Sequence, residues 1–144
     1  MSKISRSALV NFSAAQMYDL VDDIESYQSF VPFCKSSKVL ARTELAVTAE
    51  LLVAKSGIAK SFSTRNLLSR PDSIEMSLLK GPFSHLNGGW TFTKLADNAC
   101  KIELNLEFEF SNKLATFAFA KIFNLLVESM VSAFTKRARE VYGE

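Results

Sequence analysis

The chain has 144 residues, which is the size of one domain, because domains usually contain roughly 100 to 200 residues. This length excludes a two-domain enzyme. Hydrophobic residues make up 48% of the chain and charged residues 22%, and 12 phenylalanines supply ample material for a core, so the composition excludes a disordered chain. The net charge of +2 excludes a general electrostatic attraction to nucleic acid.

The charges are unevenly distributed along the chain. Residues 35–70 hold seven Lys and Arg residues, but their only acids are Glu44 and Glu50. Such a basic segment is typical of a solvated sheet face, and it could also face an anionic partner such as phosphate or membrane headgroups. The sequence alone leaves both interpretations open.

The cysteines and the N-terminus bear on where the protein works. Cys34 and Cys100 are far apart and form no CxxC motif, so neither a zinc site nor a disulfide framework is indicated, and a reduced protein is expected. The first residues lack the apolar stretch of about 7 to 15 residues that marks a secretory signal. We therefore expect a cytoplasmic location, with a peripheral position at the inner membrane as the alternative.

The first part of the chain predicts a strand followed by two short helices. Residues 3–12 alternate like a strand, and Ser13 is a helix N-cap residue in front of apolar residues at helical spacing. A second short helical segment begins near Asp22 and ends at Val31-Pro32, because the residue before a proline is pushed out of the α region.

From there to residue 110 the alternation predicts only strands, joined by short turns. The clearest segment is 101–110, which places Ile, Leu and Phe on one side and Lys, Glu and Asn on the other. One face of the sheet is therefore expected to be dry and the other wet. The predicted strands are centred on residues 37–41, 47–53, 58–67, 74–78, 86–95 and 101–110, with turn signals at Gly57, Pro71-Asp72, Gly81-Pro82 and Asp97-Asn98.

The last predicted element is a helix from about Lys113 to Tyr142, capped by Ser111 or Asn112. At 1.5 Å per residue this helix would be roughly 45 Å long. Polar residues such as Lys121 interrupt its apolar stretch well before about 20 residues, which argues against a membrane span.

This order of elements predicts an α+β fold. The economical packing is a curved antiparallel sheet of about six to seven strands wrapped around the long C-terminal helix, with two short helices after the first strand. We expect a single domain over residues 1–144.

The predicted terminal helix carries more apolar surface than packing on one sheet requires. On a helical wheel its polar residues form one narrow stripe, whereas a helix that rests on one sheet needs an apolar arc only a little over 100°. The surplus can pack on the short helices, border a ligand cavity between helix and sheet, or meet a partner such as a membrane or another chain.

Three motifs together resemble one family. They are YQSFVPFC at residues 27–34, FSTRN at 62–66 and GPFSHLNGGWTF at 81–92. With the order of elements, they are similar to the START-like, helix-grip proteins of the coenzyme Q-binding and ribosome-association toxin group, often labelled polyketide cyclase or dehydrase relatives. The resemblance covers essentially the whole chain. Gln28 departs from the pattern, because the family commonly has proline after the tyrosine.

The resemblance implies a hydrophobic tunnel between sheet and helix, and it leaves three roles open. The main expectation is a non-enzymatic carrier of ubiquinone or another isoprenoid lipid that supports respiratory quinone function, with no covalent cofactor and with transient membrane contact. The alternative is a ribosome-association toxin of a toxin–antitoxin pair, which binds the large ribosomal subunit and blocks subunit joining. A polyketide cyclase-like enzyme is third, because kinship of fold does not fix function.

The predicted tunnel-lining residues are apolar side chains on the inward face of the sheet, on the inner side of the terminal helix and in two stiff segments at the tunnel mouth. Ordinary core packing is the alternative for the same side chains. The predicted lining consists of Phe30, Val31, Pro32, Phe33, Phe62, Met76, Leu78, Phe83, Leu86, Trp90, Phe92, Leu104, Leu106, Phe108, Phe119, Ile122, Phe123 and Leu126.

Two polar residues are candidates for contact with a ligand headgroup. Arg65 and Asn66 are adjacent in a predicted strand, so at most one of them faces inward. An inward side chain would have to be satisfied by hydrogen bonds, which suits it to orient a polar headgroup. An exposed Arg65 paired with a neighbouring strand is the alternative.

Basic residues would carry the ribosome-binding role, because they contact phosphate. We expect no sequence-specific DNA binding. The candidate contacts are Lys35, Lys38, Arg42, Lys136, Arg137 and Arg139.

The sequence offers no catalytic constellation. His85 is the only histidine, and it lies on a predicted loop without a nucleophile beside it. Metal clusters, phosphate-binding loops and dinucleotide fingerprints are missing from the sequence, so we expect no catalytic residues and no metal.

Overall fold

The computed structural model describes residues 2–143, and in this range seven antiparallel strands form one sheet in the order β1-β7-β6-β5-β4-β3-β2. Three short helical segments follow the first strand, and one long helix ends the chain. The elements in chain order are β1 (Ser2–Val10), α1 (Ala14–Asp22), the 3₁₀ turn η1 (Ile24–Ser26), α2 (Tyr27–Phe30), β2 (Cys34–Arg42), β3 (Ala46–Lys55), β4 (Ile58–Ser69), β5 (Ser73–Lys80), β6 (Phe83–Ala96), β7 (Ala99–Phe110) and α3 (Phe117–Tyr142).

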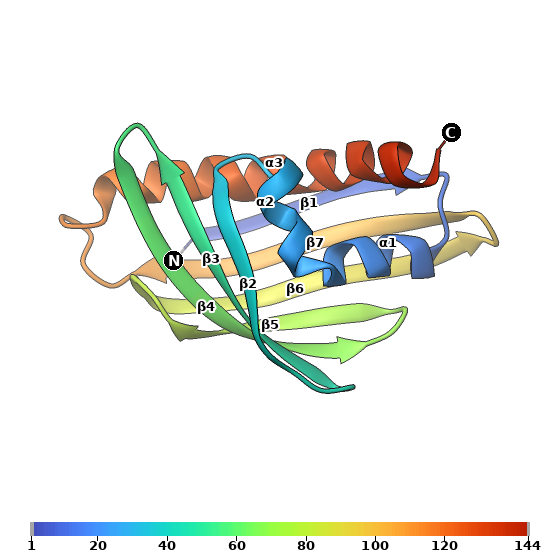
Figure 1. Ribbon diagram of the computed structural model, residues 1–144, viewed down its shortest axis with the longest axis horizontal. Coiled ribbons are helices and arrows are strands. Elements are labelled where there is room, and N and C mark those ends of the chain that lie inside the picture. The colour runs from blue at the N-terminus through green and yellow to red at the C-terminus, as the bar shows by residue number, and fades with distance from the viewer. Residues whose placement is uncertain (1, 144) are drawn as a thin grey trace.

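The sheet curves around α3 (Figure 1). Strands β1, β7 and β6 run along the same axis as α3, whereas β2, β3 and β4 turn across it. Helix α1 packs against α3, β6 and β7, and α2 packs against β2. The predicted α+β architecture, a curved antiparallel sheet gripping the C-terminal helix, is therefore confirmed.

Alternation along β7 explains why the sheet has one dry face. Ile102, Leu104, Leu106 and Phe108 are buried beneath α3, whereas the residues between them remain accessible. Burying each inward side chain contributes roughly 1.5 to 3 kcal/mol relative to an exposed position. The same period-2 pattern that predicts the strand thus also selects its buried face.

The N-terminus of α1 forms as the sequence predicts. The Ser13 hydroxyl accepts a hydrogen bond from the Gln16 backbone N–H at 3.1 Å, and the Gln16 side-chain carbonyl accepts one from the Ser13 N–H at 2.9 Å. This reciprocal capping box satisfies two backbone donors that the first turn would otherwise leave unpaired.

Three predicted boundaries are wrong. Helix α3 begins at Phe117 and not at Lys113, because the Asn112 side chain accepts a hydrogen bond from the Ala115 N–H and holds residues 113–116 in turns. Strand β1 ends at Val10 and not at residue 12. His85 lies within β6 and not on a loop, since β6 already starts at Phe83.

Helix α3 is long and apolar enough to cross a membrane by length and composition alone, a test that core helices also pass. In this fold one side of it is core. The buried side chains are Phe119, Ile122, Phe123, Leu126, Val127, Met130, Val131, Phe134 and Ala138.

Gly88 in β6 is required by the close approach of its neighbouring strand. A Cβ atom at this position would lie 2.1 Å from the Asn105 carbonyl oxygen of β7, and the φ angle of +140° is itself unfavourable for other residues. Gly57, in the β3–β4 turn, also has positive φ, but a Cβ there would meet no atom within 4 Å.

We therefore predict that Gly88→Ala lowers the free energy of unfolding by about 2 to 4 kcal/mol, because it adds a backbone clash to conformational strain. The matched change Gly57→Ala should cost only about 1 to 2 kcal/mol, from strain alone. Urea denaturation of both variants measures the difference, and equal losses would contradict this explanation.

Candidate functional site

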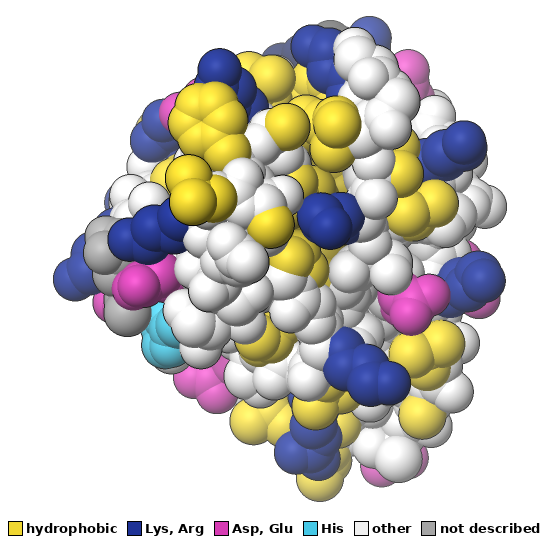
Figure 2. All heavy atoms as spheres, turned by 90° about the vertical axis from the view of Figure 1, so that its left-hand side faces the viewer, with side chains coloured by type: hydrophobic (Ala, Val, Ile, Leu, Met, Phe, Trp, Pro, Cys, Tyr) yellow, Lys and Arg dark blue, Asp and Glu magenta, His cyan; other side chains and the backbone are white. Residues whose placement is uncertain are grey.

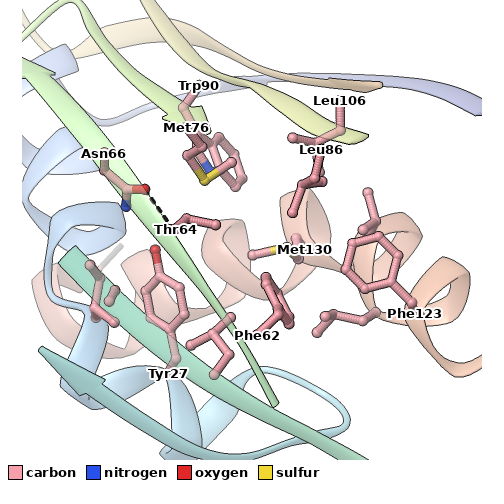
Figure 3. A pocket seen from close by; sticks show the side chains of 15 residues that line it. Tyr27, Phe62, Thr64, Asn66, Met76, Leu86, Trp90, Leu106, Phe123 and Met130 are labelled. Carbon is pink, nitrogen blue, oxygen red and sulfur yellow. Dashed lines mark hydrogen bonds between the residues drawn. The ribbon is translucent and has the colours of Figure 1, made fainter. Parts of the chain in front are cut away.

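An apolar cavity lies between the inner face of the sheet and α3 (Figure 3). The strands supply one wall, α3 supplies the opposite wall, and η1 and α2 border it through one residue each. The lining residues are Ile24, Tyr27, Ala49, Leu51, Phe62, Thr64, Asn66, Met76, Leu86, Trp90, Leu106, Phe123, Leu126, Val127 and Met130.

The cavity is small, at about 50 Å³. An engineered apolar cavity of about 150 Å³ binds benzene, whereas a single water needs roughly 10 to 15 Å³. The space therefore holds a few waters or a very small apolar group. A quinone ring with an isoprenoid tail fits only if the surrounding side chains move.

Two aromatic clusters fill most of the space that the sheet encloses. Around the first half of α3, Phe83 and Phe108 pack against Phe123 with ring centroids 4.9 and 5.0 Å apart. Around the second half, Trp90 and Tyr27 pack against Phe134 at 5.3 and 5.2 Å. The cavity is the gap that remains between these clusters, because interiors pack nearly as densely as organic crystals.

Many predicted tunnel residues consequently do not line the cavity. Seven of the predicted set do: Phe62, Met76, Leu86, Trp90, Leu106, Phe123 and Leu126. The others pack in the core or lie near the surface, with Pro32 exposed; they are Phe30, Val31, Pro32, Phe33, Leu78, Phe83, Phe92, Leu104, Phe108, Phe119 and Ile122.

Asn66 faces the cavity, and Arg65 does not. Asn66 is only 6% exposed and lines the cavity, while Arg65 is exposed on the opposite face of β4. Adjacent strand residues point to opposite faces, so the placement of Asn66 excludes Arg65 from the same cavity. The proposed headgroup contact of Arg65 is therefore wrong for this cavity.

Asn66 forms a polar pair with Thr64 on the cavity wall. The Thr64 hydroxyl donates a hydrogen bond of 2.8 Å to the Asn66 side-chain oxygen, as Figure 3 shows. No other hydrogen bond involves the Asn66 side-chain amide within residues 2–143. Its N–H groups are available to a water or to a ligand that carries an acceptor.

The α2 segment closes the cavity beside β2. The Tyr27 hydroxyl donates a hydrogen bond to the Val21 carbonyl, and burial raises the pKa of Tyr27 well above its usual value. The Gln28 backbone N–H donates to the Ser37 hydroxyl at 3.2 Å, and the Ser37 N–H donates to the Gln28 side-chain oxygen at 3.4 Å. A proline at position 28 would have no N–H for the first of these bonds. Gln28, which departs from the family pattern, therefore provides a hydrogen bond between α2 and β2 that proline could not form.

Sequence reasoning missed part of the lining. Thr64 has a sequence signal, because it alternates with Phe62 and Asn66 along β4. Tyr27 has no such signal in the sequence, because its position at the cavity depends on how α2 packs against elements that are distant in the chain. The other lining residues that were missed are Ile24, Ala49, Leu51, Val127 and Met130.

The predicted phosphate contacts differ in how available they are. Lys35, Lys38 and Lys136 are exposed, and none of them forms an ion pair within residues 2–143. Arg42 is held by Asp22, with Nη1 3.0 Å from the carboxylate and Nη2 donating to the Asp22 carbonyl at 3.0 Å. Arg42 therefore has a structural partner and is withdrawn from the candidate contacts.

The two arginines near the end of α3 also have local interactions. Arg137 lies over the Phe30 ring at 5.0 Å and pairs with Glu140 at 3.8 Å. Arg139 is exposed and also has a partner. Because α2 packs on β2 and its Phe30 lies under Arg137 of α3, α2 contacts both elements that carry the predicted phosphate contacts.

No catalytic arrangement is visible in the part of the chain from 2 to 143. No group of three or more His, Cys, Asp or Glu side chains there could hold a metal ion. His85 Nε2 lies 2.9 Å from the Asn87 side-chain oxygen. Burial raises the pKa of the Cys34 thiol to about 11, so the thiolate that a nucleophile needs is scarce at neutral pH.

A curved antiparallel sheet that grips one long helix, with an apolar cavity between them, defines the START-like, helix-grip class. Two solved structures share this fold. One is a START superfamily protein from Mycobacterium smegmatis, with a TM-score of 0.79 and 20% identity over 96% of this chain and 98% of that one. The other is the Zhui aromatase/cyclase from Streptomyces sp. R1128, with a TM-score of 0.83 and 16% identity over 97% of this chain and 95% of that one.

The chain belongs to the polyketide cyclase / dehydrase and lipid transport family, whose model matches residues 10–135. It is 54% identical to the ribosome association toxin RatA of Vibrio cholerae, and the match covers 100% of both chains. It is also 31% identical to the coenzyme Q-binding protein COQ10 homolog B of Xenopus laevis, over 96% of this chain and 59% of that protein.

We predict that Cys34 in the native protein reacts with iodoacetamide at pH 7 at least about a hundredfold more slowly than an exposed cysteine, because a pKa two units higher reduces the thiolate a hundredfold. A Ser111→Cys variant supplies the exposed reference in the same chain. Mass spectrometry of the peptides measures both rates. Similar rates at the two positions would show that Cys34 is accessible and ionised.

Proposed function

We propose that this protein associates with the large ribosomal subunit and blocks subunit joining. The observation that carries the proposal is the 54% identity, over the full length of both chains, to a protein named ribosome association toxin. The small interior space supports the same conclusion, because a protein whose core is nearly full presents its partners with its outer surface.

The surface proposed for this role flanks α2. Lys35 and Lys38 on β2 and Lys136 on α3 carry charges that no acid in the described chain neutralises. Ribosomal RNA presents a dense array of phosphates, and a lysine that contacts one of them releases a condensed counterion. Binding should therefore weaken steeply as the salt concentration rises.

We predict that the triple variant Lys35→Gln, Lys38→Gln, Lys136→Gln binds large subunits on the order of tenfold or more weakly. Its slope of log affinity against log salt should be smaller by about one for each phosphate that the variant no longer neutralises. Co-sedimentation with purified large subunits over a salt series measures both quantities.

The matched control replaces three accessible lysines that already have acidic partners, the exposed Lys3 and Lys94 and the half-buried Lys101, as Lys3→Gln, Lys94→Gln and Lys101→Gln. This control should bind like the wild type. If the wild type fails to pellet with large subunits at low salt, ribosome association is wrong. If both triple variants lose affinity equally, the proposed surface is wrong.

Binding of a hydrophobic ligand with a polar acceptor is a second candidate function. The observation that favours it is the Thr64–Asn66 pair on an otherwise apolar wall, and a relative is named as a coenzyme Q-binding protein. Each CH₂ group buried would contribute roughly 0.8 kcal/mol. The cavity would have to widen, and Met76 and Met130 in its wall are flexible enough to change rotamer.

We predict for this second function that a short-chain ubiquinone quenches the fluorescence of Trp90, the only tryptophan, which lines the cavity. Ala49→Leu should abolish the quenching, because the larger side chain takes up the cavity, whereas Ala41→Leu at an exposed position should not. Trp90 fluorescence that stays constant in excess quinone would remove this candidate and leave ribosome association unaffected.

A further inference from the structure

The outward side of the first half of α3 exposes apolar side chains next to a narrow polar stripe that contains Lys121 and Glu128, and Glu128 is paired with Arg6. Leu114, in the turns before the helix, is 94% exposed, and Phe117 is 63% exposed. Leu125 lies two turns further along the same side and is also exposed. Since the opposite side of α3 already fills the core, these side chains are the apolar surplus of the helix that the fold itself does not use.

Two lysines lie beside Leu114, Phe117 and Leu125, which together form an apolar stripe. Lys121 lies between Phe117 and Leu125 in the sequence, and its ammonium group is 4.8 Å from the Phe117 ring centroid. Lys113 precedes Leu114 and borders a surface hollow of about 270 Å³ next to Phe117, together with the acid Glu109. Neither lysine forms an ion pair with an acid in residues 2–143.

Further lysines lie at the end of the molecule where α3 starts. The β3–β4 and β5–β6 turns lie at the same end as the start of α3 (Figure 1) and add Lys55 and Lys80, which also have no ion pair within the described chain. Figure 2 shows this end, where hydrophobic side chains lie among Lys and Arg. By contrast, Arg70 and Lys94 elsewhere in the sheet are neutralised by Asp19 and Asp97.

We infer that the start of α3 docks on an anionic lipid bilayer. Leu114, Phe117 and Leu125 enter the boundary between headgroups and acyl chains, and Lys113 and Lys121 contact the anionic headgroups. An amphipathic helix with apolar residues on one face and lysines beside them binds in this way, through buried apolar area together with attraction to anionic lipid. The Lys121 ammonium group lies over the Phe117 ring, and its long alkyl stem lets the charge extend into the headgroup layer while Phe117 enters the bilayer.

Two other occupants fit this surface less well. The phosphates of ribosomal RNA would attract the lysines, but the RNA would leave Leu114 and Phe117 without apolar partners. A second copy of the chain in a two-fold interface would bring Lys113 and Lys121 of both copies into the same contact, where like charges repel. A bilayer is the partner that satisfies both the apolar and the basic side chains.

The test is flotation of the full-length protein with vesicles of phosphatidylcholine, either alone or mixed with phosphatidylglycerol. We expect binding to the mixed vesicles only. Leu114→Ser with Phe117→Ser should lower the partition coefficient about tenfold or more. Lys113→Gln and Lys121→Gln should each lower it on the order of fivefold and weaken its dependence on salt.

The matched control is Leu9→Ser with Leu95→Ser, because both leucines are exposed, at 73% and 55%, and lie outside this stripe. The control should bind vesicles like the wild type, and all variants should still pellet with large ribosomal subunits, since the bilayer site is separate from the ribosome-binding surface. The inference is overturned if the wild type does not bind anionic vesicles, or if the control loses as much vesicle binding as the variant Leu114→Ser with Phe117→Ser. It is also overturned if Leu114→Ser with Phe117→Ser abolishes only ribosome binding or only self-association.

Discussion

The structure depends on the burial of one side of α3 against a curved antiparallel sheet. The sheet formed by β1 to β7 bends around this helix, and aromatic rings from both partners pack against one another alongside aliphatic side chains. Because Phe123 and Phe134 each contact rings from several elements, they join distant parts of the chain into one core. A short gap between these two contact regions is what remains as a cavity.

This packing has a direct consequence for function. A helix-grip fold provides a place for a hydrophobic ligand, but large aromatic side chains occupy most of that place here, and a cavity of about 50 Å³ is left. The family likeness extends to a coenzyme Q-binding protein at 31% identity and to a ribosome association toxin at 54% identity, so similarity favours the second role. The filled core and the unpaired lysines around α2 favour a role for the outer surface. The stripe of Leu114 and Phe117 gives that surface a second, apolar region, whose partner is distinct from RNA.

Much of the fold follows from the sequence, because strand alternation and capping are local signals. The pattern in residues 101–110 predicts both β7 and its buried face, and Ser13 predicts the start of α1. The site follows less well, because it depends on contacts between distant elements. The sequence cannot tell that Phe83 fills the core and does not line a tunnel, nor that Asp22 holds Arg42. The choice between Arg65 and Asn66 likewise needs the register of β4, which alternation alone leaves open by one residue.

Electron cryomicroscopy of large ribosomal subunits incubated with the protein would show where the protein binds and what its interior holds. We expect density for the protein on the face of the subunit that meets the small subunit, with β2, α2 and the end of α3 toward ribosomal RNA and with no elongated ligand inside the sheet. Subunits without such density, or a bound protein whose interior holds a quinone while β2 and the end of α3 face solvent, would contradict this expectation.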